Sequence, residues 1–115
     1  AIQFSAQNEL RHIIVIDNNK QESLDFTSEI ISNGDLEKRF SAYNVDYYSV
    51  DGHDLGLMLE ILPKLTSSNG TVILDLNTIK GFGVSFMARQ PEWHSRRLKD
   101  FEYELACEEL RNINA

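Results

Sequence analysis

The amino-acid sequence predicts an α/β fold in which a parallel sheet has helices on both faces. Three short runs rich in β-branched or aromatic residues alternate with helical segments, and such connections build a parallel sheet with right-handed crossovers. These runs predict strands at 12–16, 45–50 and 71–76. The first run has no polar alternation, which is typical of a strand covered on both faces. Three strands are few for such a sheet, so we expect something to be missing from one edge.

The N-terminal half is expected to contain two short helices and a polar loop. Ile2, Ala6 and Leu10 are spaced four residues apart, which places them on one face of an opening helix. The sequence Asp-Asn-Asn-Lys at 17–20 follows the first strand as a loop, and open α/β sheets bind their ligands at the carboxyl ends of strands. A second short helix is predicted over 35–43.

The C-terminal half is expected to contain two longer helices separated by an irregular stretch. Asp54 is well placed as the N-cap of a helix over 55–65, although Pro63 should disturb its last turn. The stretch 77–98 has no convincing period and is interrupted by glycine and proline. A loop of this length is usually functional or ordered by a partner. Apolar spacing then predicts a closing helix over 100–113.

The composition is that of a folded domain whose net charge disfavours nucleic acid and anionic lipid as partners. The chain has 115 residues, 42% of them hydrophobic and 25% charged, which is close to the average of soluble proteins. Its formal net charge of -7 provides no positive field to attract nucleic acid or anionic lipid. The basic clusters at 38–39 and 96–99 stand among acids and are interpreted as solvated helix faces. We therefore expect one domain and exclude nucleic acid and membrane as partners.

The single cysteine and the lack of long apolar runs indicate where in the cell the protein is expected. Cys107 cannot form an internal disulfide and lies in a helical stretch, so we interpret it as a small core residue. No run approaches the roughly 20 apolar residues that span a bilayer, and the N-terminus lacks a basic region followed by an apolar run. A cytoplasmic location is the expectation.

Three motifs in a fixed order carry a family resemblance. They are Ile-Val-Ile-Asp-Asn-Asn-Lys at 14–20, Val-Asp-Gly-His-Asp at 50–54, and Thr-Ile-Lys-Gly-Phe-Gly-Val-Ser-Phe-Met at 78–87 followed by Pro-Glu-Trp-His at 91–94. Together they resemble the transketolase family, most closely the N-terminal subunit of the bacterial two-subunit form. The resemblance implies that residues 1–115 are the C-terminal part of a thiamine diphosphate-binding domain, whose cofactors are thiamine diphosphate and Mg²⁺ or Ca²⁺.

The resemblance implies metal ligands in the first motif. Asn19 would supply its side-chain oxygen to the ion that bridges the diphosphate, and Gln21 its backbone carbonyl; hard oxygen ligands suit Mg²⁺ or Ca²⁺. The alternative is that the amides of 17–20 hydrogen-bond their own backbone, which is the commonest role of Asn in a loop. Taken without the resemblance, the residues favour this alternative.

The third motif implies a cofactor-binding segment. Ile79 and Lys80 match positions that lie near the cofactor in the family, where a lysine offsets phosphate charge. Gly81 and Gly83 permit positive φ and a close backbone approach. The alternative for Lys80 is a solvated side chain in a flexible loop.

His94 is the candidate catalytic residue and a further cofactor contact. It matches a family histidine that contacts the cofactor and the donor sugar, where an imidazole can hydrogen-bond a hydroxyl or move a proton. The alternative is a surface histidine, and Ser95 stands where the family usually has glycine. We interpret Trp93 as a packing anchor and the other two histidines, His12 and His53, as structural.

Two departures from the family pattern are visible. The Gly-Asp-Gly half of the cofactor motif is absent, and Leu24-Asp25 stands where Asp-Gly is expected two residues before Phe26, so the loop after Asn19 is expected to be remodelled and cofactor affinity weakened. The family also uses a glutamate from a pyrimidine-binding domain that these residues do not contain.

The implied function is the transfer of a two-carbon ketol unit from a ketose phosphate to an aldose phosphate, a step of carbohydrate and pentose phosphate metabolism. The implied partners are sugar phosphates and the remainder of the enzyme, as a homodimer or heterotetramer when complete. The alternative is a truncated, non-catalytic homologue acting at most as an interaction module. An unrelated nucleotide-binding domain is disfavoured, because no Gly-x-Gly-x-x-Gly follows the first strand.

Overall fold

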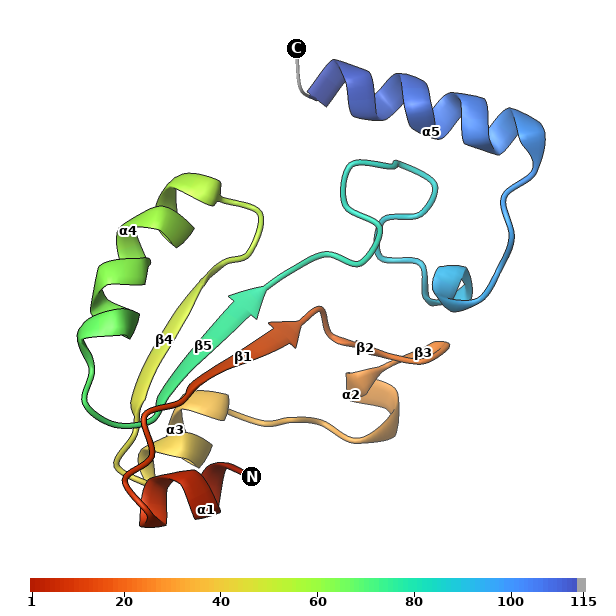
Figure 1. The fold of residues 1–115 in the computed structure, drawn as a ribbon. Helices are drawn as coiled ribbons and strands as arrows, with labels where there is room; N and C mark the ends of the chain where they lie inside the picture. Colours follow the sequence, from red (N-terminus) through yellow and green to blue (C-terminus); the bar gives the residue numbers. More distant parts are fainter. Residues whose placement is uncertain (114–115) are drawn as a thin grey trace. The chain divides into compact units, whose positions relative to one another are not determined.

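The computed structural model describes residues 1–113, which form two compact units (Figure 1). The first unit comprises Ala1–Asn18 and Asn33–Thr78. The second comprises Asn19–Ser32 and the chain from Ile79 onward. Each unit is described separately below.

The first unit is built on a three-stranded parallel sheet. Its strands are β1 (Ile13–Asn18), β4 (Asp46–Asp51) and β5 (Val72–Asn77), in the order β1-β5-β4. The predicted fold class and all three strands are confirmed. Each strand extends one or two residues past its predicted end, because Asp17 and Asn18 of β1 and Asp51 of β4 continue the ladders with β5 as far as Asn77.

One face of this sheet is covered by α4 (Leu55–Ser67). Ile61 and Leu65 of this helix pack on Val72 and Leu74 of β5 and form the core of the unit. Asp54 caps the helix as predicted, since its carboxylate accepts a hydrogen bond from the backbone N–H of Leu57 at 3.0 Å.

The predicted disturbance at Pro63 is wrong, because α4 continues through it to Ser67. The burial of Leu65, which is 3% exposed, holds the last turn against the sheet. Burying a leucine side chain contributes about 1.5–3 kcal/mol. The helix propensity cost of an interior proline is of the same size, about 3 kcal/mol.

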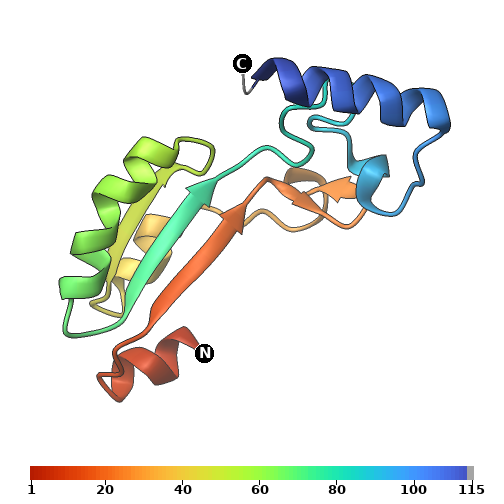
Figure 2. The same cartoon turned by 45° about the horizontal axis from the view of Figure 1, so that its top comes forward.

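The opposite face of the sheet is covered by α1 (Ile2–Gln7) and α3 (Leu36–Ser41), so helices lie on both faces as predicted (Figure 2). From α3, Phe40 packs against Tyr47 with ring centroids 6.2 Å apart. From α1, the buried Ser5 hydroxyl hydrogen-bonds Thr71 at 2.7 Å. The first helix is shorter than predicted.

This second face is polar in its centre. Asp75 is 3% exposed and its Oδ2 accepts hydrogen bonds from Tyr47 at 2.6 Å, from Asn18 at 3.2 Å and from Ser49 at 3.5 Å. Burial, and then the hydrogen bond to this carboxylate, raise the pKa of Tyr47 well above its ordinary value. The three strands are therefore tied to one another by side chains as well as by backbone pairing.

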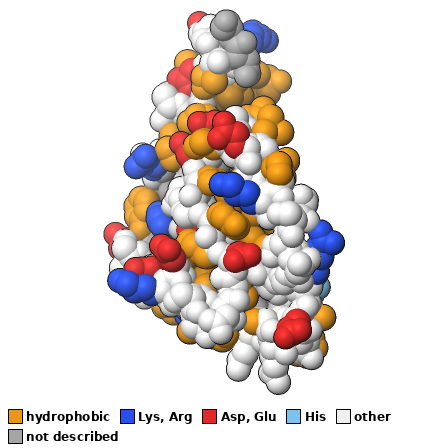
Figure 3. Space-filling view, turned by 90° about the vertical axis from the view of Figure 1, so that its left-hand side faces the viewer, with side chains coloured by type: hydrophobic (Ala, Val, Ile, Leu, Met, Phe, Trp, Pro, Cys, Tyr) orange, Lys and Arg blue, Asp and Glu red, His pale blue; other side chains and the backbone are white. Residues whose placement is uncertain are grey.

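The outer edge of the sheet differs from the sequence prediction. β1 is an edge strand, and its Ile13 and Val15 are 47% and 54% exposed, whereas the prediction was a strand covered on both faces. Ile13 and Val15 pair with Val72 and Leu74, whose side chains pack under α4. Ile13 and Val15 therefore lie on the same face of the sheet as α4, but the helix does not extend far enough to cover them. Hydrophobic side chains also reach the surface on the α4 side of the molecule (Figure 3).

The second unit has little regular structure before its last helix. It contains β2 (Gln21–Glu22), β3 (Asp25–Phe26), α2 (Thr27–Ile30), the 3₁₀ turn η1 (Pro91–His94) and α5 (Asp100–Ile113). The closing helix and the irregular stretch before it were predicted, whereas the β2–β3 hairpin was not.

Across residues 1–113, no helix combines the length and the apolar character that crossing a membrane requires.

Candidate functional site

The β2–β3 hairpin carries the two predicted metal ligands. β2 and β3 pair in antiparallel fashion, with Gln21 opposite Phe26. Lys20 and Ser23 adopt positive φ values of 63° and 57°, which non-glycine residues rarely do. The base of the hairpin is closed by a 3.0 Å hydrogen bond from the backbone N–H of Thr27 to the carbonyl of Lys20. The loop after Asn19 is therefore a tight, locally strained turn.

Asn19 and Gln21 are linked directly within this hairpin. The side-chain oxygen of Asn19 accepts a hydrogen bond from the backbone N–H of Gln21 at 2.9 Å, which is the turn that the alternative interpretation predicted. A carboxamide oxygen has two lone pairs, so this contact does not exhaust its capacity as a ligand.

The side chain of Gln21 adds an oxygen that the sequence analysis did not consider. Its Oε1 is buried and has no hydrogen-bond partner among residues 1–113. Leaving a buried acceptor unpaired costs about 1–3 kcal/mol. A cation or a donor supplied from elsewhere would remove this cost. The same described residues contain no group of three or more His, Cys, Asp and Glu side chains that could hold a metal ion.

Lys80 reaches the same hairpin. Its ammonium group donates a 3.3 Å hydrogen bond to the carbonyl oxygen of Ser23, and the residue is half-buried. Its own carbonyl accepts from the backbone N–H of Arg89 at 3.0 Å. The backbone of the segment is thus held by internal contacts, whereas the bond made by the Lys80 side chain is exposed.

The glycines after Lys80 have the positive φ values that the motif predicted, 76° at Gly81 and 89° at Gly83. The close backbone approach at Gly81 is made by its own loop, because a β-carbon there would lie 2.6 Å from the carbonyl oxygen of Met87. At Gly83 a β-carbon would lie 2.9 Å from Leu110 of α5. Both glycines therefore shape the loop and its packing on α5.

His94 ends η1 and is exposed. The preceding Trp93 is 9% exposed and donates from Nε1 to the carbonyl of Phe86 at 2.9 Å, so its predicted role as a packing anchor is confirmed. Ser95 has a φ of -139°, a value that does not require glycine. Within the unit η1 contacts β3, so His94 belongs to the same part of the structure as the hairpin.

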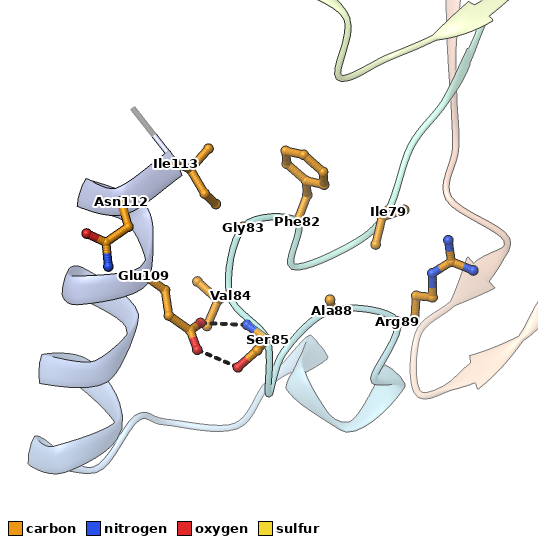
Figure 4. Close-up of a pocket in the computed structure, with 10 residues that line it drawn as sticks. All are labelled: Ile79, Phe82, Gly83, Val84, Ser85, Ala88, Arg89, Glu109, Asn112 and Ile113. Atoms are coloured by element: carbon orange, nitrogen blue, oxygen red, sulfur yellow. Dashed lines mark hydrogen bonds between the residues drawn. The ribbon is translucent and has the colours of Figure 1, made fainter. Parts of the chain in front are cut away.

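A pocket of about 540 Å³ lies between α5 and the glycine loop, the segment 80–89 that contains Gly81 and Gly83, and Ile79 lines it (Figure 4). Glu109 of α5 closes one side, where it accepts two hydrogen bonds from Ser85, one from the backbone N–H at 2.6 Å and one from the hydroxyl. These bonds hold the pKa of Glu109 below its ordinary value. The other residues lining the pocket are Phe82, Gly83, Val84, Ala88, Arg89, Asn112 and Ile113.

Comparison with known proteins identifies relatives of the chain. The chain is 33% identical to an apulose-4-phosphate transketolase subunit of Actinobacillus succinogenes over 94% of its own length, and 30% identical to the transketolase of Staphylococcus epidermidis over 95%. The chain is related to the transketolase family. It spans 40% of the first relative and 17% of the second. No family model matches the chain.

The fold agrees with that of solved transketolases. The transketolase of Campylobacter jejuni superimposes with a TM-score of 0.86 at 17% identity, covering 96% of this chain and 17% of that one. The resemblance inferred from the three motifs is therefore confirmed, and so is the transketolase-like α/β architecture.

Several side chains of this region were missed by sequence reasoning. They are the unpaired oxygen of Gln21, the Ser85–Glu109 contact and the ion pair of Arg96 with Glu102 beside Trp93. Whether such groups have partners depends on the fold. Glu109 lies 24 positions from Ser85, and a single sequence has no pattern that links such a pair. The positive φ of Ser23 likewise has no residue-type marker.

Replacing Gly81 by alanine is expected to destabilise the protein by about 1–3 kcal/mol, because the new β-carbon meets Met87 and the positive φ becomes strained. Chemical denaturation would measure the change. Gly70→Ala is the matched control, since a β-carbon there meets nothing within 4 Å. Equal stability of the two variants would contradict the geometry of the loop.

The Ser85–Glu109 contact is expected to weaken in acid. Because the native pKa of Glu109 is lowered, its contribution is present above the ordinary value of 4.5 and is lost as the pH falls through the native pKa. Replacing Ser85 by alanine removes the hydroxyl donor, so the pKa of Glu109 should rise toward 4.5. NMR titration of this carboxyl group in the two proteins would check it, and an unchanged pKa would contradict it.

Proposed function

We propose that this chain supplies part of the diphosphate-binding half of a thiamine diphosphate-dependent enzyme that transfers a ketol unit between sugar phosphates. The supporting observation is that Asn19, Gln21, Lys80 and His94 all lie in one compact unit around the β2–β3 hairpin. The second support is the 33% identity to a transketolase subunit, which extends over 94% of this chain.

The residues present fit a diphosphate–metal group in their chemistry. Gln21 has a buried acceptor oxygen without a partner in residues 1–113, and Asn19, two positions earlier in the chain, carries another amide oxygen; both are the hard ligands that Mg²⁺ or Ca²⁺ prefers. Lys80 supplies one positive charge near the same hairpin. Asn19, with the backbone carbonyl of Gln21, would hold the metal, and Ile79 and Lys80 would border the cofactor.

The chain's own residues would then have separate tasks. When bound, thiamine diphosphate supplies the carbanion chemistry that breaks and forms the carbon–carbon bond. The ammonium of Lys80 offsets phosphate charge, and it can exchange its long 3.3 Å bond to Ser23 for a charge-assisted one. His94, exposed at the end of an anchored turn, hydrogen-bonds a sugar hydroxyl or carries a proton at its ring nitrogen.

The proposed activity requires further protein. The relative from Actinobacillus succinogenes is named as one subunit of its enzyme, which points to a partner chain here as well. We propose that a pyrimidine-binding domain or subunit completes the site in a homodimer or heterotetramer, in the cytoplasm. Apulose 4-phosphate, named for that relative, is the first sugar phosphate to test.

A non-catalytic homologue is the second candidate. The observation that favours it is that Asn19 and Lys80 both already bond to the backbone of their own unit. Native mass spectrometry with and without thiamine diphosphate and Mg²⁺ separates the two. An assembly that gains both masses supports the enzyme, whereas a chain that gains neither supports the non-catalytic homologue.

Replacing Asn19 by alanine is expected to weaken binding of thiamine diphosphate and Mg²⁺ by about tenfold or more. Loss of a residue that only orients a metal ligand already lowers metal affinity by about tenfold or more, and this change removes a ligand itself. Calorimetric titration of the assembled enzyme would measure the affinity. Asn69→Ala, in an exposed turn of the other unit, is the control and should bind normally. Normal binding by the Asn19 variant would remove it from the metal site.

Replacing His94 by alanine is expected to reduce turnover by roughly 10²-fold if the imidazole handles a proton or binds the donor sugar. Steady-state kinetics of the assembled enzyme would measure kcat and KM. Glu92→Ala changes another exposed side chain of the same turn and should leave both unchanged. Unaltered kinetics in the His94 variant would place the residue outside the site.

A further inference from the structure

The turn that presents His94 cannot hold its own geometry. η1 has four residues and no side-chain cap at its first position, and a 3₁₀ turn of this length has poor internal hydrogen bonding. His94 itself is exposed, so packing of its ring does not fix it either. Whatever orients this histidine must act through neighbouring residues.

Trp93 fixes the turn from the N-terminal side. Its ring packs against Phe86 with centroids 5.3 Å apart, and its indole N–H donates to the carbonyl of the same residue. A buried tryptophan whose N–H is paired has one favoured orientation. The backbone just before His94 is therefore anchored to the glycine loop.

Arg96 and Glu102 fix the turn from the C-terminal side. The guanidinium carbon of Arg96 lies 4.1 Å from the centroid of the Trp93 ring, and the same group is paired with the carboxylate of Glu102. Glu102 is 8% exposed and its second oxygen accepts from the backbone N–H of Lys99 at 2.8 Å. Both oxygens are satisfied, and the carboxylate lies in the first turn of α5, where negative charge is favourable.

We propose that Arg96 and Glu102 are positioning residues for His94, which they hold by clamping Trp93 between the glycine loop and α5. The assignment rests on the proposed function, in which His94 acts on the sugar. Trp93 precedes His94 in the chain and Arg96 follows it. Loss of the contact between them should therefore shift the position of the imidazole while leaving the histidine in place. A misplacement of about 1 Å can reduce the rate roughly 10²-fold.

The clamp requires arginine at position 96. A guanidinium is planar, so it can stack on an indole ring while it pairs with a carboxylate, whereas a lysine ammonium is a point charge. Arg97, the next residue, is exposed, and its side chain makes neither an ion pair nor a ring contact within residues 1–113. Arg97→Ala is therefore a matched control with the same change of composition and charge.

The test compares Arg96→Ala, Arg96→Lys and Arg97→Ala in the assembled enzyme. Arg96→Ala should lower kcat by roughly ten- to a hundredfold, Arg96→Lys should lie between it and the parent, and Arg97→Ala should match the parent. Binding of thiamine diphosphate and the melting temperature report on any general loss of structure. The reaction of His94 with diethyl pyrocarbonate, followed by peptide mass mapping, should change in Arg96→Ala only.

A double-mutant comparison shows whether the clamp acts through the histidine. Adding Arg96→Ala to His94→Ala should cause no further loss of kcat, because groups acting through one residue are not additive. A further loss of the same size, or a parent-like Arg96→Ala enzyme beside an impaired His94→Ala enzyme, overturns the clamp alone. A parent-like His94→Ala enzyme overturns instead the role of His94 in the proposed function, and the clamp's catalytic purpose with it.

Discussion

The pairing of β5 with a parallel neighbour on each side is the constraint on which the first unit depends. Val72 and Ile73 are fully buried, and every residue of β5 has a partner on both β1 and β4. This register places Asn18, Asn77 and Asp51 opposite one another at the carboxyl ends of the strands. The chain leaves the first unit directly after Asn18 and again after Thr78. In the chain, Asn19 comes directly after β1, and Ile79 and Lys80 come two and three positions after the end of β5.

The sheet was predictable from sequence because its signals are local. A run of β-branched residues at 13–16 and a capping aspartate before Leu55 report on their own neighbourhoods, and the three strands and the N-cap at Asp54 were predicted correctly. Burial by other elements is not local. Leu65 keeps α4 helical past Pro63, and β1 lies at an edge where the covering layer ends.

The candidate site was predictable only as a set of residue types in order. The motifs identified Asn19, Lys80 and His94 through the resemblance, but not the groups that hold them. The hairpin depends on positive φ at Lys20 and Ser23, which residue type disfavours, and the anchors of His94 depend on Arg96 meeting Glu102. Such contacts follow from three-dimensional proximity, so a single sequence leaves them undetermined. Ser95, which stands where the family usually has glycine, has a negative φ that does not require glycine.

The internal bonds of Asn19 and Lys80 are compatible with ligand binding on energetic grounds. A hydrogen bond of this kind contributes only about 0.5–1.5 kcal/mol net, and the one from Lys80 is long and exposed. A phosphate oxygen accepting from the same ammonium forms a stronger, charge-assisted bond. The bond from the Gln21 backbone N–H to Asn19 need not break for the amide oxygen to act as a ligand, since a carboxamide oxygen has two lone pairs. These contacts therefore hold the two side chains near the hairpin at small cost to binding, whereas the unpaired oxygen of Gln21 favours the arrival of a cation or donor.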